Sequence, residues 1–337
     1  MSDYIEIDME SECKNDSTSD SDDDKKKKPA KKSIKKKEQN VKKGPGRPRK
    51  NPKKDIIERK GIFKTPTDDD NVIEILYDMP LIIKKVIGFF KSMAASQIQI
   101  LFRKDEIIMF SHDHHKKSKI RIRIDASKLN LYYCKNSLDI GCNFKDLESI
   151  MNKVDKDYIS LAIISNKNMI QKNIKLIFQN HIQIDETHTI DLIGQYDHMI
   201  NESEFLDENY MINFEWPGKY LKKTINDIKS MSTQVSLRQD NKNAPLEILY
   251  NSLNKKIHSK HIVTNNEKIK FNSRLDDGDN FRIDIKVDYI RPISTAHISD
   301  DIMIFADENK KFMTKAYIDN KTIEIKTLTE IIDDRVK

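Results

Sequence analysis

The sequence predicts an α+β protein whose body is two duplicated halves, each with the element order βαβββαβββ. A short stretch occurs twice: Lys84–Met93 and Lys222–Met231 both read Lys-Lys, five residues, Lys-Ser-Met, at an offset of 138 residues between Lys85 and Lys223. Both copies have helical apolar spacing, and each precedes a series of alternating, strand-like segments. Because several strands follow one another before the next helix, antiparallel sheets are favoured over a parallel βαβ series.

The N-terminal residues 1–68 differ from the body in charge. Residues 1–24 carry a net charge of −9 and residues 25–60 a net charge of +15, so that residues 61–337 are neutral overall. Such composition predicts a disordered tail that is first acidic and then basic. Within the basic part, Gly46-Arg47-Pro48-Arg49 resembles an AT-hook, in which proline keeps the chain extended and Arg47 and Arg49 enter an A·T minor groove. A nuclear-localisation signal or a general polyanion-binding run is the alternative.

Several function classes are not expected. The three cysteines, Cys13, Cys134 and Cys142, form no Cys-x-x-Cys pair, so neither a zinc site nor a disulfide framework is predicted. This cysteine usage predicts a reducing compartment. No apolar run reaches the roughly 20 residues of a membrane span, and the N-terminus lacks signal-peptide features. Phosphate-loop, Gly-x-Ser-x-Gly and His-Glu-x-x-His motifs are absent, so we expect no enzymatic activity and no cofactor. The histidines of loop 111–117 are adjacent rather than convergent, so no metal is expected there.

The first half, residues 69–183, holds two predicted amphipathic helices. In Leu81–Met93, apolar side chains recur at helical spacing while Lys84, Lys85 and Lys91 share the other side. In Asn143–Lys153, Asn143 serves as the N-cap. The predicted strands are Ser96–Phe102, Glu106–Ser111, Lys119–Asp125, Leu129–Cys134, Tyr158–Ser165 and Asn173–Gln179, after an unassigned first strand.

Residues 184–209 are polar, acidic and without sustained periodicity, which predicts a long connector between the halves. Its scattered apolar residues, among them Ile190, Leu192, Ile193 and Phe205, can pair with a partner strand or pocket. A plain interdomain tether is the alternative reading for most of this segment.

The second half, residues 210–337, repeats the element order of the first. Its first helix is Lys219–Met231, and a weaker helix is expected over Val287–His297, where Pro292 must lie near the first turn. The predicted strands are Gln234–Arg238, Leu246–Asn251, His258–Thr264, Lys268–Asn272, Phe281–Lys286, Ile302–Ala306, Lys311–Tyr317 and Thr322–Leu328.

Within this frame, several stretches resemble proliferating cell nuclear antigen, the DNA sliding clamp. Leu81–Lys91 resembles the first inner helix of the family. Leu131-Tyr132-Tyr133-Cys134, followed by Gly141–Leu147, resembles the Tyr-x-Cys strand and the second helix. Tyr210–Pro217 leads into the third helix as the family does, and Ile190-Asp191-Leu192 lies where the interdomain connecting loop would be. The resemblance covers about residues 70–335 and suggests a divergent clamp, as in large DNA viruses.

The resemblance implies a DNA-clamp fold, with clamp domains at 69–183 and 210–337 and the connecting loop at 184–209, assembled into a ring-shaped homotrimer around double-stranded DNA. The ring would close by pairing a strand near Asn173–Phe178 with one near His258–Val263 of the next subunit. Lysines on the inner helices would hold the phosphates without reading bases. These are Lys84, Lys85, Lys91, Lys145, Lys153, Lys219, Lys222, Lys223 and Lys229, although family basic positions on the second helix appear here as Ser149 and Asn152.

The resemblance also implies a partner pocket under the connecting loop, beside the loop around His112–Lys117. The candidates are Ile190, Leu192, Ile193 and Leu328, although Lys116, Lys117 and Lys119 lie at the pocket side and Thr327-Leu328-Thr329 replaces the family's Ala-Pro. The implied function is that of a non-enzymatic DNA polymerase processivity factor, with a polymerase and a clamp loader as partners. It would act inside the cell, in the nucleus or a cytoplasmic viral replication factory.

Two other functions remain compatible with the sequence. The first is a clamp-fold viral transcription or scaffold factor that does not serve a polymerase. The second is an architectural AT-hook DNA-binding protein whose body only dimerises.

Overall fold

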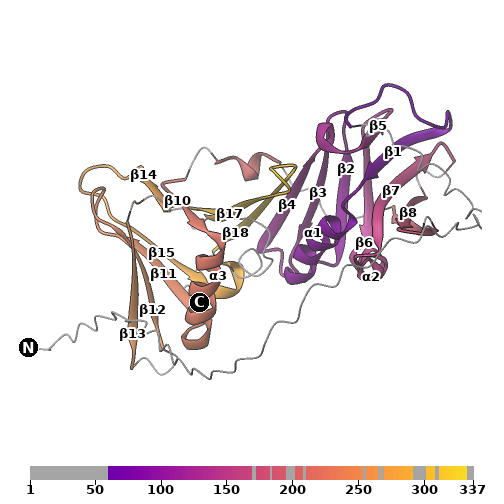
Figure 1. Cartoon of the computed structure of the whole chain (residues 1–337). Coiled ribbons are helices and arrows are strands. Elements are labelled where there is room, and N and C mark those ends of the chain that lie inside the picture. Colours follow the sequence, from indigo (N-terminus) through magenta and orange to yellow (C-terminus); the bar gives the residue numbers. More distant parts are fainter. Residues whose placement is uncertain are drawn as a thin grey trace, which may run out of the picture. The chain divides into compact units, whose positions relative to one another are not determined.

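The two halves have the same order of elements, as the repeat predicts (Figure 1). The predicted order βαβββαβββ is wrong in one respect, because five described strands rather than three directly follow the first helix of each half. The structure, a computed structural model, describes residues 60–168, 172–182, 184–194, 202–207, 210–252, 256–264, 266, 269–290, 301–307 and 311–331. The predicted helix Val287–His297 is therefore described only at residues 287–290, which are helical.

The first half contains nine strands and two α-helices among the described residues. Its elements are β1 (Asn71–Tyr77), α1 (Pro80–Ser92), β2 (Gln97–Phe102), β3 (Glu106–His112), β4 (Ser118–Asp125), β5 (Leu131–Cys134), β6 (Leu138–Asn143), α2 (Phe144–Lys153), β7 (Tyr158–Asn166), β8 (Asn173–Asn180) and β9 (Asp185–Ile193). Helices α1 and α2 pack against each other. Pro80 occupies the first turn of α1, where no intrahelical N–H is needed, and the Asn143 side chain caps α2 by accepting from the Lys145 amide at 2.9 Å.

The second half repeats this arrangement with α3 packed on its strands. Its elements are β10 (Ile212–Pro217), α3 (Gly218–Met231), β11 (Gln234–Gln239), β12 (Leu246–Asn251), β13 (His258–Val263), β14 (Lys270–Ser273), β15 (Phe281–Lys286), β16 (Asp301–Ala306), β17 (Lys311–Ile318) and β18 (Ile323–Glu330). Helix α3 contacts β10, β12 and β16.

One sheet runs through both halves. Strands β4 and β18 pair antiparallel over seven positions, from Ile323 opposite Ile124 to Thr329 opposite Ser118, and join the two halves into a 14-stranded sheet. The turn after β17 adds contacts across this junction. There, the Tyr77 hydroxyl donates to Asp319 at 2.7 Å and the Asp125 amide donates to the Thr322 carbonyl at 2.9 Å. The halves are thus joined by main-chain pairing as well as by the connector.

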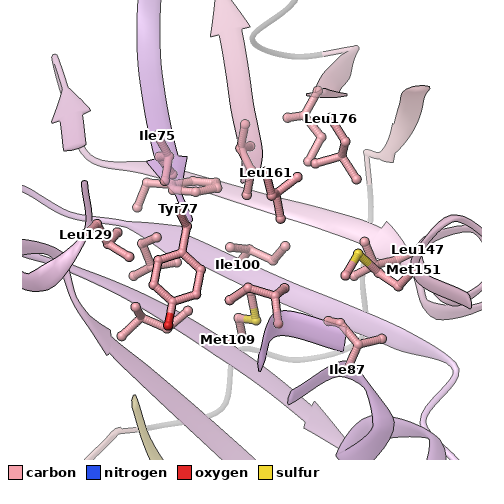
Figure 2. A pocket seen from close by; sticks show the side chains of 16 residues that line it. Ile75, Tyr77, Ile87, Ile100, Met109, Leu129, Leu147, Met151, Leu161 and Leu176 are labelled. Carbon is pink, nitrogen blue, oxygen red and sulfur yellow. The ribbon is translucent and has the colours of Figure 1, made fainter. Parts of the chain in front are cut away.

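The apolar core lies between the helices and the sheet. In the first half it encloses a cavity of about 40 Å³, lined by apolar side chains from strands and both helices, including Ile100, Met109 and Leu161 (Figure 2). An apolar cavity of this kind offers no hydrogen-bond partners to water and stays dry. It is a packing gap in the core, without the polar groups that a ligand site needs.

Two sequence expectations about the strands are wrong. Residues 185–193 were predicted to belong to an irregular connector but form β9, whose alternation is obscured because its inward residues include Glu186 and His188. The predicted free edge at Asn173–Phe178 is also wrong, since β8 is hydrogen-bonded to β7 on one side and β9 on the other. Strand β6, between Cys134 and α2, was not predicted.

Candidate functional site

The exposed residues of α3 include three lysines and one acid, Asp227. Leu221, Ile225 and Ile228 are buried against the sheet. Lys219 and Lys223, four residues apart, are exposed on the opposite side, and Lys229 is exposed on the flank that it shares with Lys222, seven residues earlier. None of these three has an ion-pair partner among the residues that the structure describes. Lys222 is partly buried and has an interaction partner of its own.

The corresponding lysines of α1 are used differently. Lys84 donates from Nζ to the carbonyl of Asn152 at 3.0 Å and to that of Val154 at 2.6 Å. These carbonyls end α2, so a cation there satisfies unpaired acceptors and complements the helix dipole. Lys91 pairs with Glu148 of α2 at 2.7 Å. Lys85 is exposed and, within the described part of the chain, has no ionic partner.

The two lysines predicted on α2 are both exposed. Lys145 lies in the first turn of the helix, where a cation is disfavoured by the dipole. Lys153 lies in the last turn and reaches Glu186 of β9 at 3.7 Å. Arg47 and Arg49 of the AT-hook-like motif lie outside the described residues.

A second candidate site is a small apolar cluster, separate from the main core, which we call the outer cluster. It is formed by Ile108, Phe110, Phe205, Tyr210, Phe305, Met313 and Leu328. Phe205 comes from the connector, in the 3₁₀ turn η2 (Glu202–Phe205), and is 1% exposed. Its ring centroid lies 6.2 Å from that of Phe110.

Five cations surround the place where η2 meets the sheet, and we call them the basic rim: Arg103, Lys119, Arg121, Lys315 and Lys326. Glu202 pairs with Arg103 and lies 3.9 Å from Arg121, while Glu204 pairs with Lys119. Asp207 accepts from Lys315 at 2.6 Å and from Lys326 at 2.7 Å. Lys326 also donates to the Phe205 carbonyl at 2.9 Å. Every carboxylate of residues 202–207 is therefore matched by a cation on the sheet.

Partial burial and ion pairing have opposite effects on the pKa values of the charged groups in this region. Burial acts to raise the pKa of Asp207, but hydrogen bonds from Lys315 and Lys326 outweigh it, so the pKa lies below its usual range. Burial acts to lower the pKa of Lys315, but the hydrogen bond to Asp207 and further contacts raise it above its ordinary value. Both groups are held charged at neutral pH.

The structure separates the four residues predicted to bind partners. Leu328 lies in the outer cluster, 1% exposed. Ile190 belongs to the main core and Leu192 packs against it, while Ile193 continues β9 opposite Gly141. Of the other members of the outer cluster, sequence reasoning singled out only Phe205, as an apolar residue of the connector. The available signal was the connector's own Glu-Ser-Glu-Phe-Leu-Asp run, in which one aromatic residue stands among acids.

The loop around His112–Lys117 is a tight turn. Asp113 accepts from the amides of Lys117 at 2.8 Å and Ser118 at 3.1 Å, and Lys116 has a φ of 56°. Within the described ranges, no group of three or more His, Cys, Asp or Glu is placed to hold a metal ion. No helix among the described residues is long and apolar enough to span a membrane.

Comparison with known proteins decides the fold. No protein-family model matches the chain. The crystal structure of proliferating cell nuclear antigen from Entamoeba histolytica superposes with a TM-score of 0.63 at 10% sequence identity, covering 77% of this chain and 98% of that one. This chain has the sliding-clamp fold. The resemblance seen in the sequence is thereby confirmed at the level of the fold, including its α+β class and its duplicated halves.

Sequence relatives of this clamp-fold chain are viral. An uncharacterized protein of African swine fever virus from a South African tick isolate is 27% identical over 307 residues, covering 87% of this chain and 99% of the relative. Its counterpart from a Kenyan pig isolate is 26% identical over 306 residues. These relatives fit a divergent clamp-like protein of a large DNA virus.

Proposed function

We propose that the protein is a DNA sliding clamp: a homotrimeric ring that encircles duplex DNA and tethers a DNA polymerase, without catalytic activity of its own. The observation that carries this proposal is the β4–β18 junction within the chain. By the internal repeat, β13 is the counterpart of β4 and β9 is the counterpart of β18. The β4–β18 pairing is thus made inside the chain, and the counterpart strands β13 and β9 are available to make the same pairing between two chains.

Both counterpart strands offer a free edge. Among the described strands, β13 has β12 as its one neighbour and ends its four-stranded sheet. Strand β9 pairs with β8 through residues 185–191, whereas only residues 192–193 of its other edge meet β6. Pairing β9 with β13 of the next subunit would remove two free edges, and repeating a heterologous contact closes a ring.

The exposed apolar side chains support the same contact. Ile182 (74% exposed) and Ile184 (57%) lie just before β9. Ile257 lies just before β13 and Ile262 lies within it, and both are 54% exposed. Carrying the β4–β18 register over to these strands sets Lys260 opposite Thr187, Ile262 opposite Asp185 and Val263 opposite Ile184. Burial of these isoleucines in a subunit interface accounts for their exposure in the single chain.

DNA would lie against the helices. Lys219, Lys222, Lys223 and Lys229 of α3 supply most of the attraction, Lys85 adds to it, and Lys91, Lys145 and Lys153 contribute at the margin. Lysines that contact only phosphates bind without base readout, so the ring can slide. Lys84 serves α2 in addition to any effect on DNA. Arg47 and Arg49 would add a minor-groove contact from the tail.

Partner proteins would dock on the outer cluster, with Leu328 as part of its floor. Ile190, Leu192 and Ile193 would act indirectly, by fixing the start of the connector. The partners would be a DNA polymerase and a clamp loader, and the place of action the nucleus or a cytoplasmic viral replication factory.

Two measurements test the proposal. The mass of the full chain in solution should be close to three times 39.5 kDa, and a monomer or dimer would count against a trimeric ring. Processive synthesis on a long primed template should increase when the protein is added with a loader and polymerase. A trimer that binds DNA but never increases processivity would favour a transcription or scaffold role.

A further inference from the structure

The connector segment 202–207, here called the acidic turn, occupies the outer cluster and basic rim. We propose that the acidic turn is an intramolecular ligand of this surface, and that a partner docks by replacing it with a peptide of the same chemistry: an aromatic residue flanked by carboxylates. The proposal rests on the proposed function, because it concerns the surface assigned there to partners.

One aromatic ring anchors the acidic turn. Phe205 is 1% exposed, while its neighbour Leu206 is 55% exposed. The ring packs beside Phe110, Met313 and Leu328, which come from three different strands of the continuous sheet. The apolar surface therefore belongs to the sheet, and the turn contributes a single side chain to it, as a bound peptide would.

Charge selects what surrounds the ring. The acidic turn supplies Glu202 and Glu204 before Phe205 and Asp207 after it. Strands of the sheet supply four cations of the basic rim, and the turn between β2 and β3 supplies Arg103. A neutral peptide with the same aromatic residue would leave Lys326, which is 7% exposed, without its carboxylate. The rim thus favours acidic flanks over apolar or basic ones.

Three of the five rim cations keep a carboxylate partner when the acidic turn leaves. Arg103 pairs with Glu106 at 3.0 Å and Arg121 with Glu324 at 3.0 Å, while Lys315 lies 3.6 Å from Glu324. Lys119 and Lys326, whose carboxylate partners belong to the turn, become open to water when it departs. Because no buried charge is stranded, the turn can exchange with another segment without disrupting the sheet.

The test uses the full chain and a fluorescein-labelled peptide with the sequence of residues 200–210. Phe205→Ser should raise the affinity for this peptide about tenfold over the native chain, because the competing anchor is gone. Leu206→Ser is the matched control, since it alters an exposed neighbour and should leave affinity unchanged. The peptide with Ala in place of its Phe should not bind. Equal affinity of the native chain and both variants would overturn the proposal.

A second measurement on the native chain stands even if Phe205→Ser fails to fold. Saturating peptide should raise amide hydrogen exchange in residues 202–207 and leave β17 and β18 protected. Unchanged exchange at saturation would overturn the proposal. The mass of the same sample distinguishes failure of the proposed ring from failure of the proposed exchange. If the protein is a monomer whose acidic turn is replaced by the peptide, only the ring is contradicted. If the protein is a trimer whose acidic turn is not replaced, only the exchange is contradicted.

Discussion

The two copies of the repeated helix share an apolar face and differ on the polar face. In α1, two lysines of the polar face interact with the neighbouring helix α2. Lys84 donates hydrogen bonds to carbonyls at the C-terminal end of α2, and Lys91 pairs with Glu148. In α3, Lys223 and Lys229 face outward without an ionic partner among the described residues. The two copies of the helix thus share the apolar side chains that pack on a sheet, whereas their exposed lysines have different partners.

The same contrast holds for the sheet edges. Strand β4 is covered by β18, whereas its counterpart β13 has an open edge among the described strands and carries the exposed Ile262. A strand edge that is closed in one half and open in the other is expected of a repeat that completes itself between subunits.

The largest expected effect is at the open edge. Ile262→Asp should convert the trimer largely to monomer, because it replaces an apolar contact with a carboxylate opposite Asp185 of the next subunit. Light scattering of the full chain measures this, and adding Asp185→Lys should restore assembly. If Ile262→Asp remains trimeric, the assigned register is wrong.

The next effect concerns DNA and the difference between α1 and α3. With Arg47 and Arg49 changed to Ala, reversing Lys219, Lys223 and Lys229 to Glu should weaken duplex binding by about 100-fold or more. The slope of log affinity against log salt should fall by about 0.9 per lost phosphate contact. Fluorescence anisotropy measures both. The control reverses Lys64, Lys104 and Lys135, exposed lysines outside the helices. An equal loss in the control would place the DNA elsewhere.

A smaller effect separates the two helices by stability. Lys84→Met should lower the free energy of unfolding by about 1–2 kcal/mol, because the last carbonyls of α2 lose their donor. Lys223→Met on α3 should change it by less than about 0.5 kcal/mol. Denaturant unfolding of both variants checks this, and equal losses would mean that Lys84 has no special role in holding α2.

The smallest effect is a pH dependence of the acidic turn. Because the folded pKa of Asp207 is below the ordinary carboxyl value, its pairing with Lys315 and Lys326 is complete above that ordinary value of about 3.9. Glu324 also faces Lys315, at 3.6 Å. Pairing is lost as the pH falls through the lowered folded pKa of Asp207. Hydrogen exchange of residues 202–207, corrected for intrinsic rates, should rise there. Asp207→Asn should abolish this rise in exchange at low pH. If the rise persists in the variant, it is caused by protonation of another carboxylate.

The sequence was informative where burial is periodic and silent where contacts are distant. Ile83, Val86, Ile87 and Phe90 specified α1 because a helix on a sheet buries one stripe. Strand β9 was missed because Glu186 and His188 occupy inward positions, where Glu186 pairs with His188 and accepts from Tyr158. The periodicity of a short stretch of sequence does not show which distant residues will hydrogen-bond to a polar side chain.

The candidate site followed the same rule. The lysine face of α3 could be read from spacing alone. The use of Lys84 by α2 could not, since the carbonyls it binds lie about 70 residues away along the chain. Likewise the docking of Phe205 depends on Arg103, Lys119 and Lys326, whose proximity only the folded sheet creates.

The most direct test of the ring is a disulfide between its proposed edges. Across an antiparallel pair, Cα atoms lie about 4.5–5.5 Å apart, within disulfide range. Thr187→Cys and Lys260→Cys, in a chain with Cys13, Cys134 and Cys142 replaced, should on oxidation yield a covalent trimer of three times 39.5 kDa that stays on circular DNA and leaves linear DNA. Monomers alone, or a ladder that continues beyond three copies, would contradict the closed trimeric clamp.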